Sequence, residues 1–198
     1  MKLLKIIIII FLALTIEINA DTEKEIINNL QKGGNLIFIR HAYAPGNGDP
    51  ENFDINNCET QRNLSQSGRL QSKKIGNFFK ENDIPIKLVI SSEWCRCKET
   101  ALIAFKNYQT ENFLNSFYSA KFAKNRKMQM KKLKDYVKSW NGDKNLVLVT
   151  HYVVISEALN YAPSSGEIVI ADKNFKKLNS VEILSLIHIS EPTRQRVI

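Results

Sequence analysis

The segment Leu36-Ile37-Phe38-Ile39-Arg40-His41 sets the architecture expected for this chain, because a short apolar run ends there on two polar side chains. A loop with several Gly and Pro residues follows, over residues 42–50. A second apolar run, residues 146–149, ends in the same way at Thr150-His151. Runs of this kind are typical of buried strands in a parallel sheet. Because ligands bind beyond the carboxyl ends of such strands, we expect the two histidines and the arginine to lie at one edge of a sheet.

The rest of the periodicity predicts helices that alternate with strands. We expect strands over residues 36–39, 87–90 and 145–149, and a closing hairpin of residues 167–171 and 179–183. We expect helices over residues 21–31, from the N-cap Ser65 onward, over residues 94–105, along the apolar series from Met130 to Trp140, and over residues 153–160. This order predicts an α/β fold, a three-layer α/β/α sandwich with a mainly parallel sheet. Residues 21–183 contain no repeat or linker and are interpreted as one domain.

The two ends of the chain are interpreted separately. Residues 1–20 have a basic start, an apolar middle and a small residue at Ala20, which predicts a secretory signal peptide. The mature chain is therefore expected to be periplasmic or secreted, with no stable membrane span after cleavage. The alternative is an uncleaved membrane anchor, for which the apolar stretch is short. Residues 184–198 include a segment that resembles a translated sequencing adapter; we interpret them as a non-native read-through tail, rather than an ordinary strand and polar tail, and give His188 no role.

The composition favours an anionic ligand. The formal net charge is +8, which suits a phosphorylated small molecule or a phosphoprotein as partner. The Lys and Arg residues are scattered among Asn and Glu, without the aromatic-interleaved stripe of a nucleic-acid surface, so no nucleic acid is expected. The sequence does not predict the oligomeric state.

A third strand end adds an arginine to the expected site. Ser91-Ser92 follows the strand at residues 87–90, and Arg96 lies in the first turn of the next helix. A helix N-terminus favours an anion, and arginine binds phosphate through two parallel hydrogen bonds. A neutral histidine can attack phosphorus, while a second histidine hydrogen-bonds the equatorial oxygens. Arg40, His41, Arg96 and His151 are therefore predicted to form a phosphoryl-transfer site.

These same segments resemble the histidine phosphatase superfamily, whose fold is called phosphoglycerate-mutase-like. Residues 36–42 are similar to its Arg-His signature, and residues 62–68, Arg-Asn-Leu-Ser-Gln-Ser-Gly, resemble its Arg-x-Leu-Ser/Thr-x-x-Gly segment. Residues 89–101 resemble its Ser-Ser-x-x-x-Arg-x-x-x-Thr-Ala stretch, and residues 146–151 its second-histidine strand. The resemblance implies that His41 is the nucleophile and forms a phosphohistidine, with Arg40, Arg96 and His151 around the phosphate. Arg62 is expected either to line this pocket or to brace its loop.

Two departures from the family leave the proton donor unassigned. The Glu-Arg-His-Tyr-Gly segment of many mutases is missing, and Tyr152 stands where many acid phosphatases of the family have Asp. Asp49, Glu111 and Glu167 are candidate acids, although each is expected to be a surface carboxylate. Substrates with good leaving groups would need less help from an acid.

The three cysteines predict a disulfide and one free thiol. Cys58 is expected to bond either Cys95 or Cys97, which flank Arg96, and this bond would anchor the loop after His41. A Cys-x-Cys metal site is the rival interpretation, but no further ligand has the spacing it needs, so no metal and no cofactor are expected. The predicted function is an exported phosphomonoester phosphatase. A catalytically inactive phosphoanion-binding relative and a phosphomutase are the alternatives.

Overall fold

A computed structural model of the protein describes residues 23–183, so the predicted signal peptide and the predicted read-through tail lie outside the described part. Within it, residues 23–32 are helical. The helices that follow are α2 (Gln66–Glu81), α3 (Cys95–Phe105), α4 (Ala120–Ala123), α5 (Arg126–Ser139) and α6 (Tyr152–Leu159), with short 3-10 turns at Cys58–Thr60 and Asn112–Leu114. The strands are β1 (Leu36–Arg40), β2 (Ile86–Ser91), β3 (Gln109–Thr110), β4 (Asn145–Thr150), β5 (Ile168–Ala171) and β6 (Lys177–Val181).

The six strands form one mixed sheet in the order β3-β2-β4-β1-β5-β6. The pairs β3–β2, β2–β4 and β4–β1 are parallel, whereas β5 runs antiparallel to both β1 and β6. The predicted α/β class and mainly parallel sheet are therefore confirmed. The expected closing hairpin is also present, as β5 and β6.

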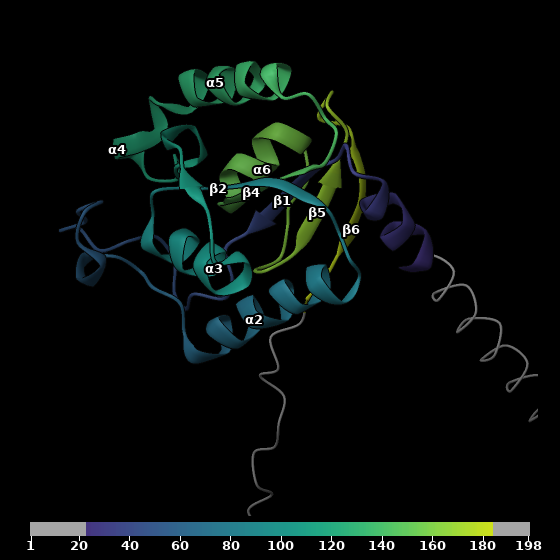
Figure 1. Ribbon diagram of the computed structural model, residues 1–198. Helices are drawn as coiled ribbons and strands as arrows, with labels where there is room; N and C mark the ends of the chain where they lie inside the picture. The colour runs from purple at the N-terminus through teal and green to yellow at the C-terminus, as the bar shows by residue number, and fades with distance from the viewer. Residues whose placement is uncertain (1–22, 184–198) are drawn as a thin grey trace, which may run out of the picture.

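Alternating side chains of the central strands form two apolar clusters, one on each face of the sheet. Leu36 and Phe38 of β1 pack in the cluster that includes residues of α5 and α6. Ile37 and Ile39 pack in the cluster that includes residues of α2, α3 and helix 23–32. Figure 1 shows α5 and α6 above the sheet and α2 and α3 below it. Because β1 is buried on both faces, it carries the continuous apolar run that a parallel strand needs.

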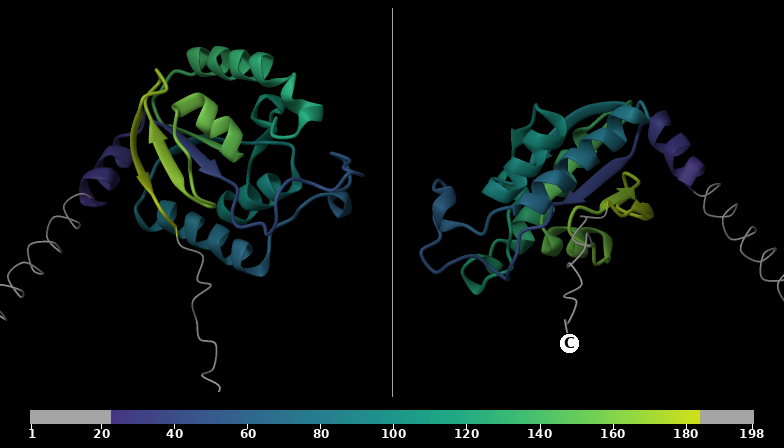
Figure 2. Two further views of the ribbon diagram at one scale, coloured as in Figure 1. Left: turned by 180° about the vertical axis from the view of Figure 1, so that it is seen from behind. Right: turned by 90° about the horizontal axis from the view of Figure 1, so that it is seen from below.

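The register of the sheet brings three strand ends to one edge. Arg40 pairs with Thr150, and Ser91 pairs with Val149. The chain leaves the sheet directly after these positions, so His41, Ser92 and His151 are neighbours in space. The loop after β1, residues 42–63, extends from this edge, as both views in Figure 2 show.

Close backbone packing fixes where this loop returns to the fold. Ser65 caps α2, accepting a hydrogen bond from the Gly68 amide as predicted. A Cβ atom at Gly68 would lie 2.1 Å from the carbonyl oxygen of Tyr43. Only glycine therefore lets the first turn of α2 approach the backbone just after His41.

No helix of residues 23–183 is long and apolar enough to cross a membrane.

Candidate active site

His41 lies at the carboxyl end of β1 with 2% of its surface exposed. Its Nδ1 lies 2.9 Å from the carbonyl oxygen of Ala42, which can only accept a hydrogen bond, so Nδ1 carries the proton. Nε2 then bears the lone pair, and it accepts a hydrogen bond from Arg96 Nε at 3.2 Å. Burial, and then the charge of Arg96, hold the pKa of His41 well below its usual value. The ring is therefore neutral at pH 7 and its unprotonated nitrogen faces Arg96.

Arg96, in the first turn of α3, is an almost fully buried cation that already forms an ion pair with Asp49. Its Nη1 donates to Asp49 Oδ1 at 2.6 Å and its Nη2 to Asp49 Oδ2 at 3.2 Å. Asp49 also accepts hydrogen bonds from the Arg62 amide and from Trp94 Nε1. Although burial alone would raise it, the pKa of Asp49 is lowered by the hydrogen bonds and charge of Arg96. An ionised carboxylate thus lies in the guanidinium fork that would suit a phosphate.

His151, the N-cap of α6, is the second buried histidine of the site. Ser92 Oγ donates to Asn115 Oδ1, which leaves it able to accept a hydrogen bond from His151 Nε2 at 2.8 Å. His151 Nδ1 then carries the lone pair and lies 3.5 Å from Arg96 Nη2. Burial, followed by the charge of Arg96, keeps the pKa of His151 well below its usual value. The His41 and His151 rings are edge-on to each other, with centroids 5.5 Å apart.

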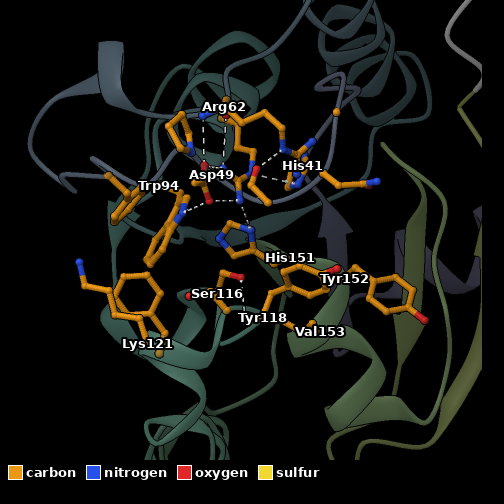
Figure 3. Close-up of a pocket in the computed structure, with 18 of the residues that line it drawn as sticks. His41, Asp49, Arg62, Trp94, Ser116, Tyr118, Lys121, His151, Tyr152 and Val153 are labelled. Atoms are coloured by element: carbon orange, nitrogen blue, oxygen red, sulfur yellow. Dashed lines mark hydrogen bonds and ion pairs between the residues drawn. The ribbon is translucent and has the colours of Figure 1, made fainter.

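Two further arginines line the same pocket. Arg40 Nη1 donates to the Pro163 carbonyl oxygen, and its Nε is buried without a hydrogen-bond partner among the described residues. Arg62 Nε donates to the Gly48 carbonyl oxygen at 2.8 Å, and its Nη1 donates to that of Ala44. Arg62 therefore both lines the pocket and braces the loop, the two alternatives that the sequence left open. Figure 3 shows Arg62, Asp49, His41 and His151 converging on one space.

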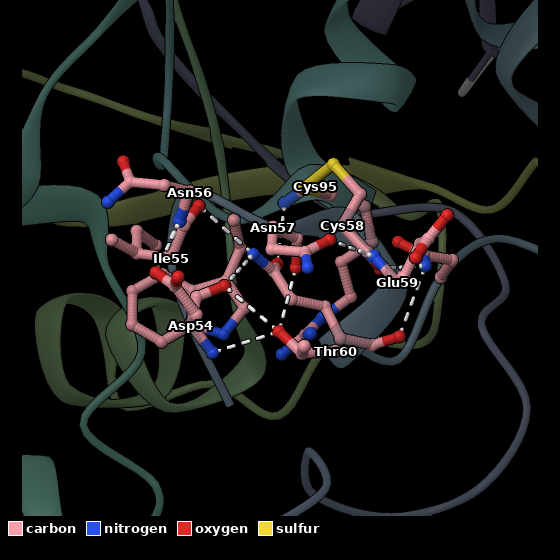
Figure 4. Close-up of a disulfide and its surroundings, with 12 residues drawn as sticks. Asp54, Ile55, Asn56, Asn57, Cys58, Glu59, Thr60 and Cys95 are labelled. Carbon is pink, nitrogen blue, oxygen red and sulfur yellow. Dashed lines mark hydrogen bonds between the residues drawn. A yellow bond between two sulfur atoms is a disulfide. The ribbon is translucent and has the colours of Figure 1, made fainter. Parts of the chain in front are cut away.

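A disulfide ties the loop of residues 42–63 to the start of α3. It joins Cys58 to Cys95, directly before Arg96, and leaves Cys97 free and buried (Figure 4). Gln61 adds to the link, because its Oε1 accepts a hydrogen bond from the Cys95 amide. Cys97 Sγ lies 3.5 Å from His151 Nε2, and burial raises the pKa of this thiol to about 12. Cys97 is therefore a neutral packing group beneath the second histidine.

The structure resembles solved structures of one superfamily. It is similar to the protein histidine phosphatase SixA complexed with tungstate, at 14% identity and a TM-score of 0.50 over 73% of this chain and 92% of that one. It is also similar to phosphoglycerate mutase from Thermus thermophilus, at 14% identity and a TM-score of 0.53 over 75% and 98% of the two chains. The product of an open reading frame of Mycobacterium tuberculosis matches at 15% identity and a TM-score of 0.54, over 76% and 97%. The fold is that of the histidine phosphatase superfamily.

The match lies in the fold, since no protein-family model and no curated protein sequence matches the chain. The resemblance of the four sequence segments to the histidine phosphatase superfamily is thus supported by an independent comparison of shape. The motif residues Arg40, His41, Arg96 and His151 all line one pocket of about 450 Å³ within this fold.

The expected surface location of the candidate acids is wrong for two of them. Glu167 is 1% exposed, and its carboxylate accepts hydrogen bonds from the Tyr161 hydroxyl and the Ser164 amide. It was missed as a buried residue because it precedes β5, whose pairing with β1 does not follow from the sequence pattern. Asp49 is partly buried and lines the same pocket as His41 and Arg96. Glu111 is partly exposed and does not line the pocket.

Sequence reasoning gave no role to the polar residues that support His151. Ser92 and Asn115 form a chain of hydrogen bonds to it, and Asn115 is oriented by the amide and carboxylate of Glu93. The repeated serine directly after β2 was the available signal for Ser92, whereas Asn115 lies in a segment without periodicity. Among residues 23–183 no group of three His, Cys, Asp or Glu side chains could hold a metal ion.

Proposed function

We propose that the chain is a phosphomonoester phosphatase that works through a phosphohistidine at His41. One observation carries the proposal: the neutral ring of His41 has its Nδ1 proton fixed by Ala42, so its lone pair is directed toward Arg96. Arg40 and Arg62 line the same pocket beside the neutral His151, and their positive charges stabilise the charge that spreads over the phosphoryl oxygens. The similarity of fold to a protein histidine phosphatase and a phosphoglycerate mutase supports this reaction class.

The reaction has two displacements at phosphorus. His41 Nε2 forms a bond to phosphorus as the ester P–O bond breaks, and the departing alkoxide or phenolate takes a proton from water. Water then attacks the phosphohistidine and the N–P bond breaks. Inorganic phosphate departs, and the free His41 ring is regenerated. Substrate phosphate must displace the Asp49 carboxylate from Arg96 before the first step, because both anions use the same guanidinium nitrogens.

The substrate is proposed to be a small phosphorylated molecule or a phosphoprotein, without a nucleic-acid partner. Export to the periplasm or the medium is part of the proposal. The disulfide between Cys58 and Cys95 supports it, since such bonds persist in oxidising compartments. Residues 1–20 support it through their signal-like pattern.

His41→Ala tests the function. We expect at least about a 10³-fold loss in phosphate release from phenyl phosphate, because the variant lacks the nucleophile. Brief incubation of the wild type with ³²P-labelled substrate should leave acid-labile label at position 41. Full turnover by His41→Ala, at an unchanged melting temperature, would refute the proposal.

A second candidate is a catalytically inactive phosphoanion-binding relative. It is favoured by the state of Asp49, whose ionised carboxylate offers no proton to a leaving group. Phosphate binding without phosphate release from any phosphomonoester would select this alternative. A phosphomutase would instead return the phosphoryl group to a second position of the organic molecule, which product analysis detects.

A further inference from the structure

The pocket that contains His41 continues outward over a group of aromatic side chains. These line the pocket together with the phosphate-binding residues, and we call them the aromatic wall: Phe53, Trp94, Tyr118, Phe122 and Tyr152. They come from the loop after β1, the N-terminus of α3, the segment around α4, and the start of α6. Segments far apart in sequence thus place rings around one opening.

Contacts between the rings make most of this wall continuous. Phe53 stacks on Trp94 with centroids 4.9 Å apart. Phe122 meets Phe53 and Trp94 edge-on, at 5.6 and 5.5 Å. Trp94 in turn meets the His151 ring edge-on at 5.4 Å, so the wall begins directly beside the phosphoryl-transfer residues.

The outer members of the wall are exposed to solvent. Tyr118 is 66% exposed and Tyr152 is 43% exposed, although both carry large aromatic rings. Both line the pocket, beside the labelled Ser116 and Val153 in Figure 3. Aromatic rings that stay uncovered next to a reaction centre offer apolar surface to the organic part of a ligand.

The carboxylates that line the pocket also favour a ligand with an aromatic group, because neither is placed as a buried proton donor. Asp49 and Glu51 are the two carboxylates that line the pocket in the described chain, and Asp49 is ionised in its pair with Arg96. Glu51 is exposed to solvent. An alkyl alcohol leaves as a strongly basic alkoxide and needs an acid, whereas a phenol, with a pKa of about 10, can leave as phenolate.

We propose that the aromatic wall is a subsite for the leaving group and that the enzyme acts on aryl phosphomonoesters. The inference rests on the proposed phosphatase function and names its substrate class. The aryl ring packs against Tyr118 and Phe122 while the phosphoryl group lies among Arg40, Arg96 and His151. His41 Nε2 forms its bond to phosphorus as the aryl P–O bond breaks, and the phenolate then takes a proton from water.

Binding of phosphonates tests the subsite without turnover, because their C–P bond is not cleaved. Calorimetry on the wild-type protein should give about tenfold tighter binding for benzylphosphonate than for methylphosphonate, as expected for one packed aromatic ring. Tyr118→Ala and Phe122→Ala should each weaken benzylphosphonate binding about threefold or more and leave methylphosphonate binding unchanged. Leu70→Ala is the matched control, since Leu70 is 52% exposed on α2 and does not line the pocket.

Each result decides between the subsite and its absence. Equal affinities for the two phosphonates, tighter binding of a sugar phosphonate, or no effect of either aromatic variant would overturn the subsite. Discrimination without any phosphate release from phenyl phosphate would retain the subsite and reject the phosphatase function. Phosphate release without discrimination would do the reverse.

Discussion

Asp49 is the residue whose role changed most between sequence and structure. Its carboxylate joins the loop to Arg96, to Trp94 and to the amide of Arg62. It also holds a negative charge where the proposed substrate places one. The energy of its bond to Arg96 therefore opposes phosphate binding.

Neutralising this carboxylate should strengthen anion binding. We predict that Asp49→Asn lowers the inhibition constant of inorganic phosphate about tenfold, because phosphate no longer competes with a charged partner for Arg96. Competitive inhibition of phenyl phosphate hydrolysis gives the measurement.

The matched control for this change is Glu51→Gln, which removes the other carboxylate of the pocket from a solvent-exposed position. Its effect should stay below about twofold, since exposed charges interact weakly. Unchanged or weaker phosphate inhibition in Asp49→Asn would show that the ion pair does not compete with substrate.

At the level of single residues, the sequence predicted those that lie next to a strand end. Arg40, His41 and His151 were placed correctly because the carboxyl ends of parallel strands share an edge, and Arg96 because it opens the following helix. Asp49 is a candidate acid from the sequence, but its position in the pocket does not follow from the sequence. It lies inside a long loop, where no periodic pattern relates position in sequence to position in space.

Among the elements, the loop of residues 42–63 is held in place by its disulfide more than by regular secondary structure. It contains one short helical turn, Cys58–Thr60, and the disulfide to Cys95 closes a separation of 37 residues. The loop contributes Asp49, Phe53 and Arg62 to the pocket. The position of these side chains should therefore follow the state of the disulfide.

Removing the disulfide should lower stability and weaken substrate binding together. For the double variant Cys58→Ser/Cys95→Ser, we predict a loss of about 2–4 kcal/mol in the free energy of unfolding, from the greater freedom of the unfolded chain. KM for phenyl phosphate should rise several-fold, while His41 keeps its place directly after β1. Urea unfolding and steady-state kinetics provide the two measurements.

Reduction of the wild-type protein gives the control for this pair of substitutions. A reductant should reproduce both effects in the wild type and change nothing further in the double variant. An unchanged KM together with lower stability would show that the disulfide stabilises the fold without positioning the pocket residues, which would contradict its proposed role.

Short elements were the ones that the sequence missed. The strand β3 has two residues and α4 has four, too few to show a hydrophobic period. α4 nevertheless carries Phe122 to the aromatic wall, so the sequence did not predict this part of the pocket lining. The long helices α2 and α5 each have one repeating buried face, and β4 is a continuous buried run, so the predicted positions of these three elements agree with the structure to within a few residues.

For the whole molecule, the alternation of apolar runs and amphipathic helices sufficed to predict an α/β fold with a mainly parallel sheet. The position of β5 between β1 and β6 could not be predicted from the sequence, because strand order depends on contacts between distant segments and not on local pattern. With β4 on one side and β5 on the other, β1 is an inner strand of the sheet, and His41 directly after it is buried, as is His151 after β4. Protonating these buried histidines costs free energy in the folded state, and this cost affects the stability of the whole domain.

Stability should therefore fall as the solution becomes mildly acidic. His41 and His151 both have a pKa well below the usual value in the folded protein, first through burial and then through the charge of Arg96. Below pH 6.5 the unfolded chain binds protons that the folded chain does not, so the stability present above this pH is lost as the pH decreases toward the lowered pKa values. The slope should approach about 1.4 kcal/mol per pH unit for each histidine.

Urea unfolding between pH 7.5 and 5, in a buffer without phosphate, measures this slope. The range lies above the pH at which Asp49 takes up a proton, so its ion pair with Arg96 stays intact throughout. His41→Gln and His151→Gln should each remove about half of the pH dependence, because glutamine is neutral over the whole range. A slope that is flat in the wild type, or unchanged in both variants, would mean that the two buried rings gain protons as readily as histidines in the unfolded chain.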